Sequence, residues 1–196
     1  RQKAKKPILI NDLKLIIKVL NEEKINAKNL VEGKVKGQNK LRDKALILIG
    51  FAGGFRRSEL VNIEYDDIEF VNEGVKILIK RSKTDQSGEG TIKAIPYFDN
   101  NEFCPVIALK EYIKHKFSGN NIGKVFEISD KSVALIIKRY AEKAGLDGSR
   151  YAGHSLRSGF ATTAAEFGAE ERNIMAMTGH KTTQMVRRYI HEANLF

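Results

Sequence analysis

The sequence is poor in cysteine and in long apolar runs, and both shortages limit the kind of protein it encodes. Its single cysteine, Cys104, excludes an internal disulfide and fits a reducing compartment. No apolar run approaches the length of a membrane span, so we expect no membrane partner. The basic start, RQKAKKPILI, lacks the long apolar region and the small-residue cleavage site of a secretion signal.

Motifs for nucleotide-dependent and metal-dependent chemistry are also missing. The sequence has no GxxxxGKS/T phosphate loop and no GxGxxG turn. No carboxylate pair stands out for two-metal chemistry, and the histidines lack the paired spacing of a zinc site. These histidines are His115, His154, His180 and His191. We therefore expect a protein that uses no metal ion, no nucleotide and no other cofactor.

Acidic residues are outnumbered by basic ones. The 24 Asp and Glu residues stand against 34 Lys and Arg residues, which gives a net charge of +10. This imbalance favours a polyanionic partner, with nucleic acid ahead of a membrane surface. The 196 residues, 42% of them apolar, suffice for one fair-sized domain or two small ones. Because the chain starts at Arg1 without methionine, we expect it to be a piece of a longer protein.

Apolar spacing predicts helices in the first sixty or so residues. Asn11 is suited to cap a helix whose apolar positions begin at Leu13. Residues 21–38 are polar and contain two glycines, so we expect them to form a loop. A second helix then ends at the Gly53-Gly54 pair, and a short third helix begins with two arginines in its first turn.

Between Tyr65 and Tyr97 the apolar pattern changes to alternation, which predicts a small antiparallel sheet. The link RSKTDQSGEG between its last two strands indicates an exposed, mobile hairpin tip, and Lys83 stands on it. Helical spacing returns after Pro105 and again over residues 133–144. The predicted fold class is therefore mainly α with a small antiparallel β-sheet, an α+β protein.

The last forty-odd residues, 153–193, contain residue types suited to binding an anion. An apolar stripe predicts a helix that packs inward through Leu156, Phe160, Ala164 and Phe167. His154 and Arg157 are three apart, so they share one face near the N-terminus of this helix if it extends that far. Unpaired backbone N–H groups and the positive end of the helix dipole favour an anion there.

Two further short helices are predicted in this stretch. Gly168 breaks the first helix, and residues 169–177 form a second one that ends at Gly179. His180 follows directly, in the turn before a third helix. Tyr189 lies on the apolar face of that third helix, and taken alone it is best explained as part of this face.

Two arginines, Arg56 and Arg57, lie in the first turn of the third predicted helix, where positive charge is unusual. A cation at a helix N-terminus is disfavoured by up to ~1 kcal/mol. Arg56 is more comfortable there if an anion, or Glu59 three residues later, lies nearby. A surface Arg–Glu pair of little energetic value is an equally good explanation from this motif alone.

Six residues resemble, in this order, the catalytic set of the tyrosine recombinases. They are Arg56, Lys83, His154, Arg157, His180 and Tyr189. This family comprises site-specific DNA recombinases and includes the phage integrases. GFRRSEL resembles the family's first arginine box, with Glu59 at the supporting acidic position, and RSKTDQ resembles its lysine hairpin. GHSLRSGFAT matches the His-x-x-Arg box. TGHKTTQMVRRY matches the last box, whose tyrosine lies nine residues past the histidine.

The resemblance implies a tyrosine recombinase catalytic-domain fold over residues 8–196, preceded by a basic linker or arm over residues 1–7. We expect the family's N-terminal core-binding domain, which closes a clamp around DNA, to be absent from this sequence. The implied partner is double-stranded DNA, bound by a homotetramer on paired sites, although this piece alone should associate weakly or stay monomeric. The implied setting is the bacterial cytoplasm, with a bacterial or phage-encoded protein of a mobile element acting on nucleoid DNA.

The implied reaction is DNA cleavage and rejoining without a metal ion or ATP. The oxygen of Tyr189 attacks a phosphodiester and retains the ester energy in a 3′-phosphotyrosyl bond. Arg56 and Arg157 offer planar forks to the negative charge that develops, and His180 adds a donor.

Proton transfers complete this reaction. His154 is the candidate base or orienter for the tyrosine, and Lys83 is the candidate donor to the departing 5′ oxygen.

Two other classes of protein explain part of the pattern. A type IB topoisomerase resembles this family in fold and active-site set but relaxes DNA without exchanging strands. A non-catalytic DNA-binding module would explain the charge equally well, although binding alone does not require Tyr189 and the full cationic set. Tetramer formation on paired sites would favour the recombinase over the topoisomerase, and covalent trapping would reject the binding module.

Overall fold

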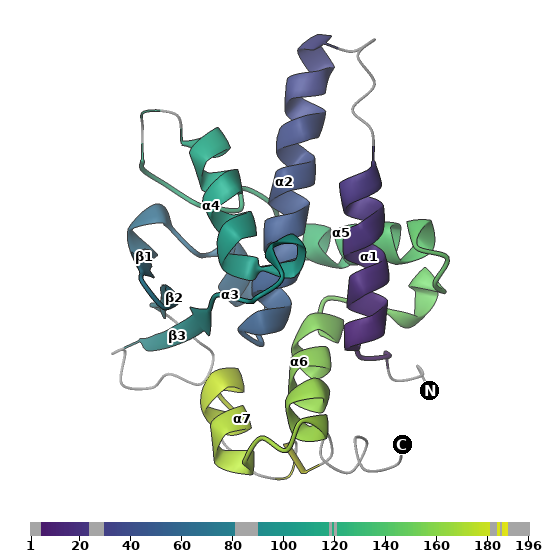
Figure 1. Ribbon diagram of the computed structural model, residues 1–196, viewed down its shortest axis with the longest axis vertical. Helices are drawn as coiled ribbons and strands as arrows, with labels where there is room; N and C mark the ends of the chain where they lie inside the picture. The colour runs from purple at the N-terminus through teal and green to yellow at the C-terminus, as the bar shows by residue number, and fades with distance from the viewer. Residues whose placement is uncertain are drawn as a thin grey trace.

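The computed structural model describes residues 5–23, 30–80, 90–117, 119, 121–180, 184, 186 and 187, and residues 30–38 through their backbone alone. Its helices, shown in Figure 1, are α1 (Ile10–Glu22), α2 (Leu30–Ala52), α3 (Arg57–Val61), α4 (Pro105–Lys116), α5 (Asp130–Lys143), α6 (Ser155–Glu166) and α7 (Glu171–Thr178). Short 3-10 turns are η2 (Tyr65–Asp67), η3 (Asn101–Phe103) and η4 (Gly148–Arg150). Over these described ranges, no helix has both the length and the apolar character to cross a lipid bilayer.

The strands form one antiparallel sheet in the order β1-β2-β3. Their bounds are β1 (Ile68–Val71), β2 (Gly74–Ile79) and β3 (Thr91–Pro96). The sheet lies at one side of the helices (Figure 1). The predicted fold class, mainly α with a small antiparallel β-sheet, is confirmed.

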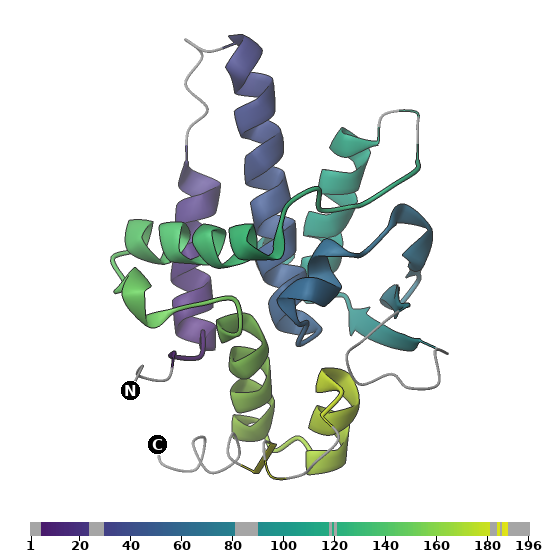
Figure 2. The same cartoon turned by 180° about the vertical axis from the view of Figure 1, so that it is seen from behind.

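Helix α2 forms the centre of the molecule. Figures 1 and 2 show it upright, with α1 alongside, α4 on one side and α5 crossing on the other. Residues 45–50 of α2 are all buried, and a helix that is apolar on every side requires neighbours all round. One of these neighbours is α6, whose Leu156 is fully buried and lies against Gly50. The end of α2 is therefore held firmly by the core.

The start of α2 corrects the prediction that residues 21–38 form a loop. Helix α1 extends to Glu22, and α2 already begins at Leu30. A glycine inside a helix costs only about 1 kcal/mol relative to alanine. Because helix growth is cooperative and the far half of α2 is anchored in the core, its two interior glycines do not end it.

Strand β2 follows the predicted alternation, whereas β3 buries Lys93 and Ile95 and exposes Ile92. In β2, Val75, Ile77 and Ile79 are buried, whereas Lys76 between them is exposed. Ile77 pairs across the sheet with Lys93 of β3. Lys93 is consequently turned toward the core, and it is only 4% exposed.

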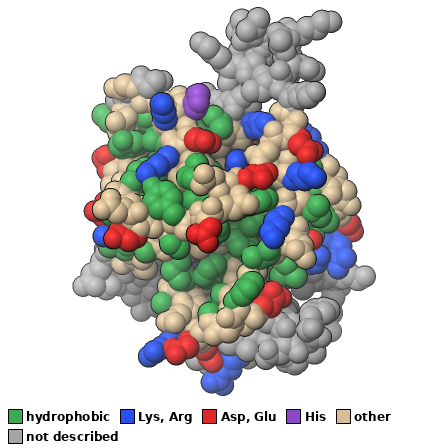
Figure 3. Space-filling view, viewed as in Figure 1, with side chains coloured by type: hydrophobic (Ala, Val, Ile, Leu, Met, Phe, Trp, Pro, Cys, Tyr) green, Lys and Arg blue, Asp and Glu red, His purple; other side chains and the backbone are tan. Residues whose placement is uncertain are grey.

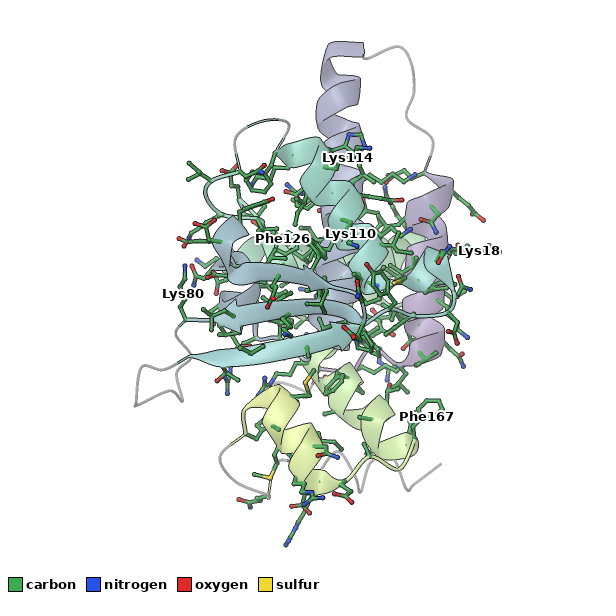
Figure 4. The ribbon with its side chains drawn as sticks, turned by 60° about the vertical axis from the view of Figure 1, so that its left-hand side comes forward. Lys18, Lys80, Lys110, Lys114, Phe126 and Phe167 are labelled. Atoms are coloured by element: carbon green, nitrogen blue, oxygen red, sulfur yellow. The ribbon has the colours of Figure 1, made fainter. Side chains whose placement is uncertain are left out.

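Helix α6 departs from the predicted apolar stripe at the last position, Phe167. This side chain is 79% exposed and points away from the helices in Figure 4. Phe167 is the residue directly after the end of the helix at Glu166, and its backbone N–H still donates to Thr163 O at 3.0 Å, as in a helix. The prediction that Phe167 packs inward was wrong because helical spacing fixes the direction of a side chain, whereas burial also requires another element to cover it.

The described part of the N-terminal segment packs against the start of α6. The backbone N–H of Lys6 donates to Arg150 O at 2.7 Å, and that of Ile8 donates to Ser155 O at 2.9 Å. Lys6 Nζ lies 3.1 Å from the carboxylate of Asp12, and Ile8 is fully buried. This segment therefore supports the helix that carries the His-x-x-Arg pair.

Gly159 allows α6 and this segment to approach closely, because a Cβ at position 159 would lie 2.0 Å from Ile8 O. We expect Gly159→Ala to push the two backbones apart and to lower the free energy of unfolding by about 1–3 kcal/mol. Chemical denaturation followed by circular dichroism measures this change. Ser158→Ala is the matched control on the same helix, and equal stability of both variants would contradict the prediction.

Candidate active site

The site is built on the turn that follows α2. Gly54 has a φ of 56°, in the left-handed region that favours glycine. A side chain would also collide with α6 there, because a Cβ at position 54 would lie 2.8 Å from a ring carbon of Phe160. The turn thus presents the backbone carbonyls of Gly53 and Gly54 to side chains from β3 and, at Gly54, from α6.

Glu59 holds Arg56 at the N-terminus of α3. Its Oε2 accepts the backbone N–H of Arg56 at 2.8 Å, and its Oε1 accepts from Arg56 Nη1 at 2.7 Å. Glu59 is only 5% exposed, and its negative charge offsets the unfavourable position of a cation at a helix N-terminus. The pair that the sequence spacing allowed is therefore present, and it is not a solvated surface pair.

Arg157 reaches the same place from α6. It is 4% exposed. Its Nη1 donates to Gly54 O at 2.9 Å, and its Nη2 lies 3.3 Å from His180 Nε2. A buried guanidinium requires such partners. These contacts therefore fix the plane of the guanidinium.

His180 follows the end of α7. The helix is capped by Gly179 at a φ of 65°, and the Gly179 carbonyl accepts from Arg56 Nη2 at 3.2 Å. The ring Nδ1 lies 2.7 Å from Thr178 Oγ1. Burial, together with nearby positive charge that comes mainly from Arg157, lowers the pKa of His180 to about 4. The ring is therefore neutral at pH 7.

His154 stands immediately before α6. Its backbone is helical, with φ −82° and ψ −11°, so the three-residue spacing places it on the face that carries Arg157. The residue is exposed, yet neighbouring protein atoms remove part of the ring's hydration. This desolvation, followed by the charges of Arg57, Arg157 and Arg56, lowers the pKa of His154. His154 is thus also neutral at pH 7.

Lys93 is a member of this cluster that the motif analysis missed. Its Nζ donates to Gly53 O at 2.8 Å and to Gly54 O at 3.3 Å, and it lies 3.5 Å from Glu59 Oε2. The same ammonium group lies 4.4 Å from the centre of the Phe55 ring. Burial, which Glu59 offsets in part, lowers the pKa of Lys93 to about 8. The signal in the sequence was its two-residue spacing from Ile95, which places both side chains on one face of β3.

Two of the predicted site residues, Lys83 and Tyr189, lie outside the described residues. The last described residue before Lys83 is Lys80, at the edge of the sheet in Figure 4. Its Nζ lies 2.6 Å from Glu64 and 2.9 Å from Asp67, and the hydrogen bonds that it donates to Asp67 and Glu64 raise the pKa of Lys80. Lys80 therefore forms ion pairs with Glu64 and Asp67, which are separate from the cluster around Arg56 and Arg157.

The arrangement is suited to a ligand with negatively charged oxygens. Arg56, Arg157 and His180 come from three separate segments, and they are linked through the carbonyls of Gly54 and Gly179. In the part of the chain that is described, no three His, Cys, Asp or Glu side chains lie close enough together to hold a metal ion.

Lys93→Met tests the electrostatic state of this cluster. The pKa of Lys93 is about 8 in the folded protein, against an ordinary value of 10.5, so the unfolded chain binds more protons between these values. This lysine therefore makes the free energy of unfolding rise as the pH rises from about 8 to about 10.5. We expect the Lys93→Met protein to lack this contribution.

Urea unfolding of both proteins at several pH values across this window measures the difference between them. Lys76→Met, on the exposed side of β2, should leave the pH dependence of the wild type intact. If the difference between wild type and Lys93→Met stays constant with pH, the prediction is wrong.

Comparison with known proteins agrees with the geometry. The sequence matches the phage integrase family over residues 18–195. An integrase/recombinase xerD homolog of Selenomonas ruminantium is 44% identical over 207 residues, which cover 100% of this chain and 56% of that protein. The chain thus spans about half the length of the curated relatives it matches.

Solved structures show the same fold at lower identity. One of these structures is XerH site-specific recombinase bound to a palindromic difH substrate, in a post-cleavage complex. It aligns with a TM-score of 0.74 and 19% identity, and the alignment covers 98% of this chain and 51% of XerH. XerA recombinase aligns with a TM-score of 0.69 at 19% identity, over 97% of this chain and 61% of that one. Since the family match extends over most of its length, the chain belongs to the phage integrase family.

Proposed function

We propose that this chain is the catalytic part of a site-specific DNA recombinase, which cleaves and rejoins DNA strands through a 3′-phosphotyrosyl intermediate. The observation that carries the proposal is the convergence of Arg56, Arg157 and His180 on one site. DNA binding alone does not require buried arginines, because phosphate contacts of that kind work well from an exposed surface. The names of the relatives, recombinases in each case, favour strand exchange over relaxation.

The arginines stabilise the charge that develops during phosphoryl transfer. Attack on a phosphodiester adds negative charge to the non-bridging oxygens, and a guanidinium meets two oxygens at once. Glu59 and the Gly54 carbonyl hold Arg56 and Arg157 in place before DNA arrives. A donor that is oriented in advance lowers the barrier by about 2.7–4 kcal/mol.

Tyr189 is the proposed nucleophile, and the burial of other tyrosine hydroxyls supports this choice. Three other tyrosines donate to partners within the protein: Tyr112 to Val125 O, Tyr140 to Glu23 and Tyr151 to Asp12. Burial raises the pKa of each of these hydroxyls, that of Tyr112 to about 12. A hydroxyl of this kind neither reaches DNA nor loses its proton easily.

Neutral His154 is the proposed base or orienter for the tyrosine, since its lowered pKa leaves a lone pair free to accept a proton. Lys83 is the proposed donor to the departing 5′ oxygen. Residues 8–196 form the proposed catalytic domain, after a linker or arm over residues 1–7. The proposed assembly is a homotetramer on paired sites in double-stranded DNA, and the proposed setting is the cytoplasm of a bacterium, in line with a bacterial relative.

The distribution of the described charges helps to place the DNA phosphate. On the face shown in Figure 3, Lys and Arg side chains are interspersed with Asp and Glu. Within the site, positive charge gathers where Arg56, Arg157 and Lys93 meet. We therefore place the scissile phosphate of the DNA at this cluster.

A suicide substrate, a DNA duplex nicked near the target phosphate, tests the nucleophile. The full-length protein in excess chelator should give a covalent protein–DNA band on a denaturing gel, and Tyr189→Phe should abolish it because the attacking oxygen is gone. Tyr151→Phe, which removes a hydroxyl bonded to Asp12, should retain the band. A band that persists in Tyr189→Phe, or cleavage that depends wholly on added Mg²⁺, would contradict the mechanism. DNA binding without any band in the wild type would favour a binding module.

Arg157→Lys tests transition-state stabilisation. Lysine keeps the charge but loses the fork, so the rate of band formation should fall by about 10²–10³-fold while Tyr189 still forms the adduct. Arg150→Lys, at an exposed arginine of η4, is the matched control and should keep the wild-type rate. Equal rates for Arg157→Lys and wild type would remove Arg157 from the reaction.

A further inference from the structure

Thr178, the last residue of α7, makes two short polar contacts that involve the site. It is 1% exposed. Its Oγ1 lies 2.7 Å from Ile174 O, one helical turn earlier, and 2.7 Å from Nδ1 of His180. Its methyl group faces the Gly54 turn, 3.3 Å from where a Cβ of residue 54 would lie. Thr178 therefore touches both the ring of His180 and the turn that carries the arginine contacts.

A count of protons determines what Thr178 does to His180. A threonine hydroxyl has one proton, and a backbone carbonyl can only accept. The hydroxyl proton therefore goes to Ile174 O, an arrangement common for threonine in helices. Oγ1 consequently turns a lone pair toward His180, so the ring nitrogen facing it, Nδ1, must carry a hydrogen.

The other ring nitrogen gives the same answer independently. His180 Nε2 lies 3.3 Å from Nη2 of Arg157, and a guanidinium only donates hydrogen bonds. Nε2 therefore presents its lone pair to Arg157. The opposite tautomer would set two lone pairs against each other at Thr178 and two N–H groups against each other at Arg157.

We propose that Thr178 is a positioning residue that holds His180 in the Nδ1–H tautomer, so that His180 donates to a DNA phosphate only after Nε2 takes up a proton. This inference rests on the proposed function, because it concerns the phosphate that Arg56 and Arg157 would bind. The proton comes from solvent and converts the neutral ring into an imidazolium. Phosphate binding is then coupled to proton uptake at one nitrogen.

The surroundings of the ring supply the driving force for this coupling. The charged groups that face it from the described elements are Arg157 on α6, Arg56 before α3 and Lys93 on β3, and all three oppose a positive ring. Glu59 is the carboxylate that contacts Arg56 and Lys93. A phosphate placed among these cations cancels their repulsion and raises the pKa of His180.

Two substitutions separate the tautomer from packing. Thr178→Val keeps the shape and the methyl contact but removes the oxygen, so Nδ1 loses its acceptor and the Nε2–H tautomer becomes accessible. Thr178→Ser keeps the oxygen and should behave like the wild type. Thermal unfolding of both variants establishes that they fold.

Nitrogen NMR of protein labelled with ¹⁵N-histidine reads the tautomer directly. In the wild type and in Thr178→Ser at neutral pH, Nδ1 of His180 should show the chemical shift of a protonated nitrogen and Nε2 that of an unprotonated one. Thr178→Val should shift both signals toward the opposite tautomer. The loss of signals in His180→Asn assigns the resonances. A wild type in the Nε2–H or imidazolium form, or a Thr178→Val protein with an unchanged tautomer, would overturn the inference.

The link to the reaction has its own measurement. With the suicide substrate, cleavage by the wild type and by Thr178→Ser should fall about tenfold per pH unit above the pKa of His180 in the DNA complex. The profile of Thr178→Val should be flatter there, because its Nε2 donates without extra protonation. Identical profiles for all three proteins would overturn the coupling. If no covalent band forms at all, the proposed function fails while the NMR result still decides the tautomer.

Discussion

Two cations from distant parts of the chain donate to one carbonyl oxygen, that of Gly54, and the geometry of the site depends on this shared contact. Arg157 reaches it from α6 at 2.9 Å, and Lys93 reaches it from β3 at 3.3 Å. A carbonyl oxygen has two lone pairs, so both donors fit. Because the turn requires a left-handed residue without a side chain, Gly54 ties the end of α2 to the sheet and to α6 at a single point.

The cluster is held together against its own repulsion. Arg157 and Arg56 are among the causes of the lowered pKa values of both Lys93 and His180, so the positive potential extends across the whole cluster. Before any ligand binds, the carboxylate of Glu59 and the backbone carbonyls that accept hydrogen bonds from these cations offset the positive potential. Residues that oppose the general rules of burial are expected at functional sites, where the rest of the fold compensates for them. A bound phosphate would remove the repulsion, and we therefore expect the fold to be more stable with DNA than without it.

Local parts of this site could be predicted from the sequence, whereas its long-range contacts could not. The spacing of Arg56 and Glu59 indicated their pairing because a helix places such residues side by side. No spacing rule connects Arg157 to Gly54, and only the family resemblance indicated that these segments meet. Lys93 was missed because a lysine in a strand is normally counted as exposed, although its register pointed inward. Phe167 was predicted wrongly because periodicity gives the direction of a side chain and not whether another element covers it.

Arginine and histidine contribute different properties to the proposed reaction. An arginine stays charged even beside other cations, so Arg56 and Arg157 keep a constant positive charge through every step. Burial, followed by the charges of Arg157 and Arg56, lowers the pKa values of His154 and His180, which are therefore neutral at rest and free to change their protonation when a phosphate arrives. Rejoining is the reverse of cleavage, so each proton donor in one direction must act as an acceptor in the other. The protein's own side chains meet this requirement, because the arginines keep a constant charge while the histidines can gain and lose a proton.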